Sequence, residues 1–282
     1  MIKHNIMKKF GAIMLSASMV IAMAGCGTAS STEQAESTTE AAQQENTKIL
    51  IAAAASLEAT FENELIPMFE EQNPGIEVEG TYASSGDLQH QIEAGLEADV
   101  FMSAATSNMD TLVEEGLVDE ATVVDLLKND VVLIVPKDIE TTVIGFEDIQ
   151  NADTVAIGDP ESVPAGKYAK EILTNLGNYD AVAEKASFGT SVTEVCTWVA
   201  EGSADAGIVY STDALNENSN GDDKEVTVLA TAEDSMMDTP VIYPVGLTAS
   251  SAQQEAARKL VDFLQTEGVM NVFVENGFTA NN

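Results

Sequence analysis

The sequence predicts an α/β protein with two lobes. From Lys48 to the end of the chain, short apolar runs typical of buried strands alternate with segments in which apolar residues recur at helical spacing. Such alternation predicts mostly parallel sheets that helices cover on both faces. The predicted folded part has about 235 residues, more than one hydrophobic core usually takes, so two lobes are expected.

The first strands and helices are predicted from apolar runs and from glycines that end helices. Lys48–Ala55 is a continuous apolar run, which predicts a strand buried on both faces. Apolar spacing predicts a helix over Leu57–Glu71, and Gly95 and Gly116 end two shorter helices. The other strands predicted in this half are 76–83, 99–104 and 131–135, and the two shorter helices are 87–94 and 108–115.

The same alternation continues in the second half. Glycines that follow apolar-periodic segments end two of its helices, at Gly177 and Gly202. Asn216–Lys224 is polar throughout and predicts a loop. The predicted strands are 154–158, 206–210, 226–230 and 241–248, and the predicted helices are 165–176, 191–201, 252–265 and 269–276.

The charge balance excludes several classes of function. Lysine and arginine number 12 and aspartate and glutamate 47, so the formal net charge is −35. Three of the lysines precede residue 26, which leaves 9 − 47 = −38 for the rest. This rest has no basic stripe for phosphate backbones, so we expect no nucleic-acid partner. Two cysteines and two histidines are too few for most zinc sites.

The N-terminus has the pattern of an export signal. Lys3, Lys8 and Lys9 precede an uncharged, largely apolar stretch over 10–25, which is short for a bilayer-spanning helix. Met23-Ala24-Gly25-Cys26 resembles the lipobox of bacterial lipoproteins, which implies cleavage after residue 25 and two acyl chains on Cys26. Residues 26–47 are then a flexible tether. We expect an extracytoplasmic protein anchored to the cell membrane as a lipoprotein.

The inventory of reactive groups argues against an enzyme. After cleavage His90 is the one histidine, and no P-loop, G-x-G-x-x-G, G-x-S-x-G or H-E-x-x-H motif is present. Cys196 lies on an apolar helical face and is interpreted as a small buried hydrophobe. We therefore expect no catalytic residues. A surface lipoprotein hydrolase or an adhesion module stays as an alternative, and loss of activity on changing His90 would favour it.

Small hydroxyl-bearing residues and glycines gather where predicted strands pass into helices. They are Ser56, Ser84-Ser85-Gly86, Val163-Pro164-Ala165-Gly166, Thr190-Ser191-Val192 and, at a strand end, Tyr210. A single serine at such a place is most often a helix cap. Several junctions that converge on one cleft would instead bind an anion, through helix N-terminal N–H groups. Because arginine is nearly absent, the donors are neutral and the ligand should be a fully deprotonated oxyanion.

An ordered set of motifs carries a resemblance to a known family. Ala53–Leu57, Tyr82–Leu88, Gln91–Gly95, Ala98–Ala104, Ala156–Lys170 and Gly207–Tyr210 together resemble the molybdate-binding component of molybdate ABC transporters, from about residue 48 to 279. The resemblance implies a two-lobe periplasmic-binding-protein fold of type II, with the ligand in the interlobe cleft and two crossings of the chain. Lobe one would be 48–129 plus 246–282, and lobe two 130–245.

The same resemblance implies the ligand and its contacts. A monomer would hold molybdate, and tungstate as well, through neutral hydrogen-bond donors and pass it to an ABC permease. No cofactor and no direct bond between the metal and the protein are expected. Another tetrahedral oxyanion such as sulfate is the alternative ligand. The corresponding positions are Ser56, Ser85, Ala165, Val192 and Tyr210.

Overall fold

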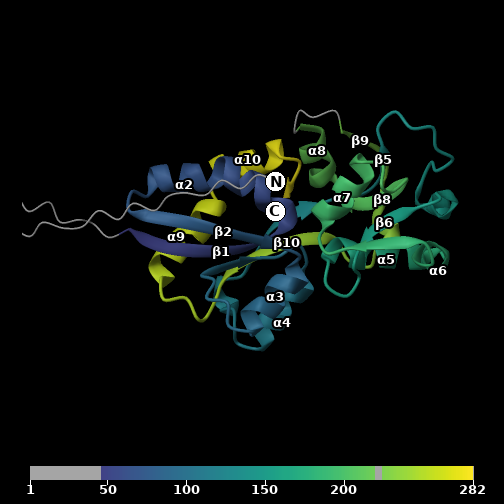
Figure 1. The fold of residues 1–282 in the computed structure, drawn as a ribbon. Helices are drawn as coiled ribbons and strands as arrows, with labels where there is room; N and C mark the ends of the chain where they lie inside the picture. Colours follow the sequence, from purple (N-terminus) through teal and green to yellow (C-terminus); the bar gives the residue numbers. More distant parts are fainter. Residues whose placement is uncertain (1–45, 220–223, 282) are drawn as a thin grey trace, which may run out of the picture. The chain divides into compact units, whose positions relative to one another are not determined.

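The computed structural model describes residues 46–219 and 224–281, which form two sheets with helices packed on both (Figure 1). The predictions made for residues 1–45, including the lipidation of Cys26, lie outside the described residues. No helix in the described part is long and apolar enough to cross a bilayer.

The first lobe is built on a six-stranded sheet with the order β11-β4-β10-β3-β1-β2. Its strands are β1 (Thr47–Ala54), β2 (Ile76–Ala83), β3 (Val100–Met102), β4 (Val124–Asn129), β10 (Val241–Leu247) and β11 (Thr279–Ala280). Its helices are η1 (Ala55–Leu57), α1 (Glu58–Thr60), η2 (Phe61–Leu65), α2 (Ile66–Gln72), α3 (Ser85–Glu93), α4 (Thr106–Glu114), η3 (Glu120–Thr122), α9 (Gln254–Leu264) and α10 (Glu267–Glu275).

The second lobe is built on a five-stranded sheet with the order β7-β6-β8-β5-β9. Its strands are β5 (Val131–Pro136), β6 (Val155–Gly158), β7 (Ala186–Gly189), β8 (Ala206–Tyr210) and β9 (Val226–Thr231). Its helices are η4 (Phe146–Asn151), α5 (Pro164–Asn175), α6 (Tyr179–Ala183), α7 (Val192–Ala200), α8 (Ser211–Ser219) and η5 (Asp234–Met236).

The sheets are mixed, whereas the sequence predicted mostly parallel ones. β1 pairs in parallel with β2 and β3, and β6 with β7 and β8, but β5 and β10 pair antiparallel with both of their neighbours. The physical reason is the route of the chain. β5 and β10 each enter their sheet from the other lobe, without the crossover helix that joins parallel strands within one lobe.

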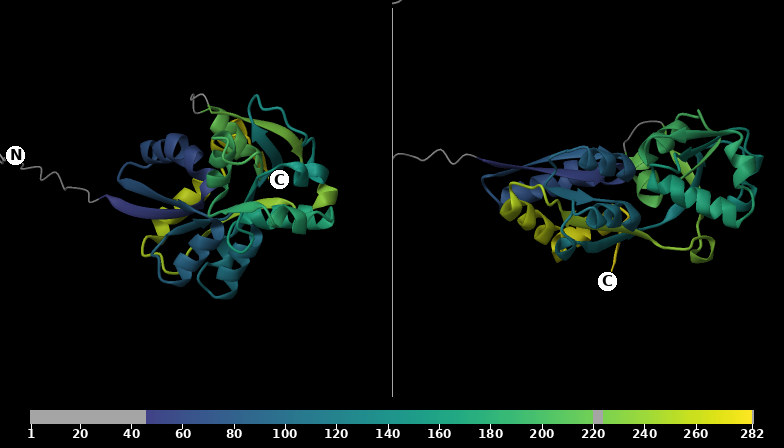
Figure 2. Two further views of the ribbon diagram at one scale, coloured as in Figure 1. Left: turned by 45° about the vertical axis from the view of Figure 1, so that its right-hand side comes forward. Right: turned by 90° about the horizontal axis from the view of Figure 1, so that it is seen from below.

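The return of the chain also decides how the C-terminal helices are placed. β10 pairs along its whole length in the six-stranded sheet, so residues 241–245 lie with the first lobe, whereas the predicted boundary fell after 245. Helices α9 and α10 then pack beside the N-terminal elements, as the yellow and purple-blue segments of Figure 2 show. Asn276 donates to Glu64 across this contact at 2.8 Å.

The predicted helix 57–71 is present as one helical stretch of changing pitch. Its middle is a π turn, in which the N–H of Ile66 bonds to the carbonyl of Phe61. Pro67 follows directly, and its ring cannot fit against an ordinary α turn, so we attribute the wider turn to this proline. The predicted loop over 216–224 is partly wrong, because α8 runs through Ser219.

Candidate functional site

A small cavity lies between the two lobes, and all five predicted ligand-binding residues line it. The first lobe contributes the ends of β1 and β2 with the helix starts that follow, and the second lobe contributes α5, α7 and β8. The cavity has about 210 Å³ of atom-free space, part of which is open to solvent. Its lining is Ala54, Ala55, Ser56, Ala83, Ser84, Ser85, Ala104, Val163, Pro164, Ala165, Val192 and Tyr210. None of these residues carries a charge.

Helix α3 presents its first backbone N–H to this region. Ser84 caps the helix, because its Oγ accepts from the N–H of Asp87 at 3.1 Å. The N–H of Gly86 donates to the carbonyl of Ser162 at 3.0 Å. Since the first N–H groups of a helix have no intrahelical acceptor, the N–H of Ser85 is left for a ligand.

Helices α5 and α7 repeat this arrangement from the second lobe. Pro164 is the first residue of α5 and has no N–H, so Ala165 supplies the first donor of that helix. In α7 the cap is Ser191, whose Oγ accepts from the N–H of Glu194 at 3.1 Å, and Val192 supplies the first N–H. The partial positive charge of these helix ends favours an anion in the cavity.

The Ser85 hydroxyl is held in place by the backbone. It is fully buried, and its Oγ accepts from the N–H of Ala104 at 2.9 Å. Because a hydroxyl has one proton to give, this bond leaves the proton free to donate to a ligand.

Ser56 is tied to a buried network between the lobes. Its side chain caps no helix, contrary to what its place after the first strand suggested. Instead its Oγ lies 2.9 Å from the Tyr243 hydroxyl, and that hydroxyl accepts from Asn129 Nδ2 at 3.1 Å. Asn129 Nδ2 also donates to Thr212 Oγ1 at 2.9 Å, at the start of α8 in the second lobe. The network therefore connects Ser56 with the first crossing of the chain.

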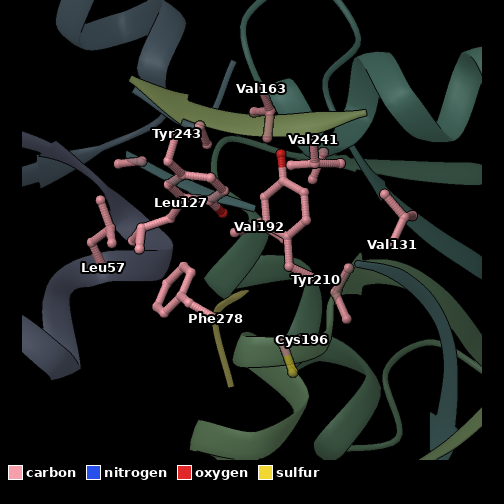
Figure 3. Packing of buried hydrophobic residues seen from close by; sticks show 14 of the residues in the cluster. Leu57, Leu127, Val131, Val163, Val192, Cys196, Tyr210, Val241, Tyr243 and Phe278 are labelled. Carbon is pink, nitrogen blue, oxygen red and sulfur yellow. The ribbon is translucent and has the colours of Figure 1, made fainter. Parts of the chain in front are cut away.

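The Tyr210 hydroxyl has no hydrogen-bond partner among the described residues, although it is buried. The ring packs edge-on against Tyr243 with the centroids 5.9 Å apart, and its hydroxyl points toward the side of Val163 and Val241 (Figure 3). Burial raises the pKa of this phenol well above its usual value, so it remains a donor at neutral pH. An orphaned buried hydroxyl is costly, and a ligand oxygen in the cavity would satisfy it.

Two of the larger grooves among the described residues, unlike the cavity, have charged side chains in their lining. One is lined by loop residues near Pro74 and by the start of α9, and it contains none of the predicted residues. The other lies beside the cavity and is lined by Glu58, Glu62, Asp213 and Glu217, among others. Burial raises the pKa of Asp213 to about 7, and its neighbours in this groove are acidic. An oxyanion would be repelled there.

Neither of the other reactive side chains lines the cavity, and the predicted burial of Cys196 is confirmed. His90 is exposed on α3, and Cys196 is a buried free thiol whose pKa is raised by burial. No group of three or more His, Cys, Asp or Glu side chains within 46–219 and 224–281 is arranged to hold a metal ion.

Sequence reasoning did not single out Tyr243 and Asn129, which support Ser56. The available signal was weak. Asn129 stands at the predicted crossing between lobes, and Tyr243 is the one residue with a hydroxyl in the apolar run 241–247. Neither stands at a strand-to-helix junction, where the search for donors was made.

Two α/β lobes joined by crossing strands, with an uncharged cavity between them, define a binding protein for a small solute. The chain belongs to the family of bacterial extracellular solute-binding proteins, which it matches over residues 49–279. Its relatives are named as substrate-binding proteins and not as enzymes, so the hydrolase alternative is set aside.

Two curated proteins and one solved structure show the relationship in detail. A Bacillus subtilis protein named as an ABC transporter substrate-binding lipoprotein, YvgL, is 34% identical over 97% of this chain and 99% of its own length. The Escherichia coli molybdate-binding protein ModA is 35% identical over 82% of this chain and 89% of its own length. A solved structure from Clostridium difficile, described as the substrate-binding domain of a molybdenum ABC transporter, is 35% identical, with a TM-score of 0.63, and the match covers 84% of this chain and all of that chain.

Proposed function

We propose that this protein captures molybdate in the cavity between its lobes, through Ser56, Ser85, Ala165, Val192 and Tyr210. The observation that carries the proposal is the buried Tyr210 hydroxyl, which has no partner in the described structure and lines the same uncharged cavity as three helix N-termini. Relatives that share about a third of the sequence are named as molybdate-binding proteins.

The donor set selects the charge state of the ligand. Backbone N–H groups, serine hydroxyls and a phenol supply protons, and the lining has no carboxylate to accept one. A protonated oxygen would face another donor proton, so phosphate, which is protonated near neutral pH, fits poorly.

Tungstate is expected to bind as well, because its size and charge are nearly those of molybdate. Sulfate has the same charge but is smaller, so a preformed cavity leaves some donors out of its reach. Sulfate remains the alternative ligand, and its exclusion depends on how rigidly the lobes hold the cavity.

Thermal unfolding with molybdate, tungstate, sulfate or phosphate at matched ionic strength tests the ligand. A ligand present at 100 times its dissociation constant adds about 2.7 kcal/mol to the free energy of unfolding. For a protein of this size the midpoint then rises by roughly 5–10 °C. We expect this shift with molybdate and tungstate only. A shift with sulfate alone would replace the proposed ligand, and no shift with any of the four would refute an oxyanion site.

We further propose that the protein is a lipoprotein, anchored through Cys26, that delivers its ligand as a monomer to an ABC permease. The Bacillus subtilis relative named as a lipoprotein supports the anchor. Cys26→Ala should move the protein from the membrane fraction to the soluble fraction, and continued sedimentation with membranes would contradict the anchor. Light scattering of the released protein should give the mass of one chain.

A further inference from the structure

Among the described residues, one backbone–backbone hydrogen bond joins the two lobes beside the cavity. The N–H of Gly86, in the first turn of α3, donates to the carbonyl of Ser162 in the loop before α5, at 3.0 Å. Gly86 follows the predicted ligand residue Ser85, and Ser162 precedes Ala165 by three positions. The contact therefore brings together the two chain segments that contribute donors from opposite lobes.

Both partners are held rigidly within their own lobes. On the first-lobe side, the Ser84 cap fixes the start of α3. On the second-lobe side, the carbonyl of Asp159 accepts from the N–H groups of Ser162 and Val163, and its Oδ1 accepts from Glu161. Neither segment can yield without losing these bonds, so the separation of Gly86 and Ser162 follows the separation of the lobes.

The contact leaves no room for a side chain. A Cβ added to Gly86 would lie 2.3 Å from the Ser162 carbonyl oxygen and 2.8 Å from its Cα, and both are backbone atoms. Real Cβ contacts are essentially never closer than 3.0 Å. The conformation of Gly86 itself does not require glycine, since it has no positive φ. What requires glycine here is the approach of the opposite lobe.

We propose that Gly86 is the closure contact of this protein: it lets the lobes close over the oxyanion, and any side chain at this position would hold them apart. The proposal rests on the proposed function, because it assigns to Gly86 a role in enclosing that ligand. Gly86 is a positioning residue, because the proposal gives it a contact with Ser162 and none with the ligand.

The chain offers a matched control. Gly268 is, like Gly86, the second residue of a nine-residue helix, and a Cβ added there meets nothing within 4 Å. Alanine is the better helix former, so neither Gly→Ala change should weaken its helix. The experiment compares wild type, Gly86→Ala and Gly268→Ala, each in the full chain with Cys26→Ala. It measures molybdate affinity by calorimetry and the radius of gyration by X-ray scattering, with and without molybdate.

We expect Gly86→Ala to bind molybdate on the order of tenfold more weakly or worse. Its radius of gyration should exceed that of Gly268→Ala both with and without molybdate, and Gly268→Ala should behave as wild type. Wild-type affinity in Gly86→Ala would overturn the proposal, and so would a radius of gyration equal to that of Gly268→Ala. If wild type binds no oxyanion, the proposed function fails. Scattering without ligand then tests the contact between Gly86 and Ser162 alone. A larger radius of gyration in Gly86→Ala than in wild type supports this contact, and identical scattering curves overturn it.

Discussion

Removing the Tyr210 hydroxyl should stabilise the ligand-free protein and weaken ligand binding at the same time. In the structure this hydroxyl is buried and has no partner among the described residues. Tyr210→Phe deletes an unsatisfied polar group, which costs about 1–3 kcal/mol where it is buried. The same change deletes one hydrogen bond to a charged ligand, worth about 1.5–3 kcal/mol.

The two effects can be measured separately. Without ligand, the unfolding midpoint of Tyr210→Phe should rise by roughly 2–12 °C relative to wild type. Calorimetry should show a dissociation constant for molybdate raised by roughly 10- to 150-fold. A lower midpoint in the absence of ligand would mean that the hydroxyl already has a partner. Unchanged affinity would remove Tyr210 from the site.

Three further predictions follow from neighbouring contacts. Ser85→Ala should also weaken binding by about 1.5–3 kcal/mol, but it should lower the ligand-free midpoint, because the buried N–H of Ala104 loses its acceptor; a raised midpoint would contradict this. Burial raises the pKa of Asp213 in the folded state to about 7. The free energy of unfolding of wild type should therefore fall by up to about 4 kcal/mol as pH rises from about 4 to 7, because the buried carboxyl loses its proton over this range. Asp213→Asn should flatten that dependence in urea unfolding at pH 5 and 8, and parallel curves would refute the assignment. Asn129→Ala should cost about 1–3 kcal/mol in urea unfolding at pH 7, since Thr212 and Tyr243 lose their shared partner, and an unchanged midpoint would mean that this network adds no stability.

Local chemistry at the strand-to-helix junctions was enough to find the residues that line the cavity. Ser84 and Ser191 cap helices as their positions indicated, and Pro164 begins one. A residue that caps or begins a helix can be recognised from the residues next to it in the sequence. Whether these junctions bind the proposed ligand stays a prediction, since lining a common cavity is not itself binding.

Features set by distant parts of the chain were missed. The antiparallel pairing of β5 and β10 depends on which lobe each strand comes from, which no local pattern records. The partnership of Ser56 with Tyr243 joins residues 187 positions apart. β7 and β11 are largely exposed and so lack the continuous apolar run that revealed β6, which is no longer than β7.

The start points of α5 and α7 have a consequence for how this site can change over evolutionary time. At Ala165 and Val192 the proposed donors are main-chain groups, which every residue except proline possesses. Most substitutions at these two positions would therefore keep the donor, provided that the helix still begins at the same residue. The position of these donors is set by the backbone, which Pro164 and Ser191 fix by starting the two helices. Two members of the family could therefore bind the same anion with different side chains at these positions.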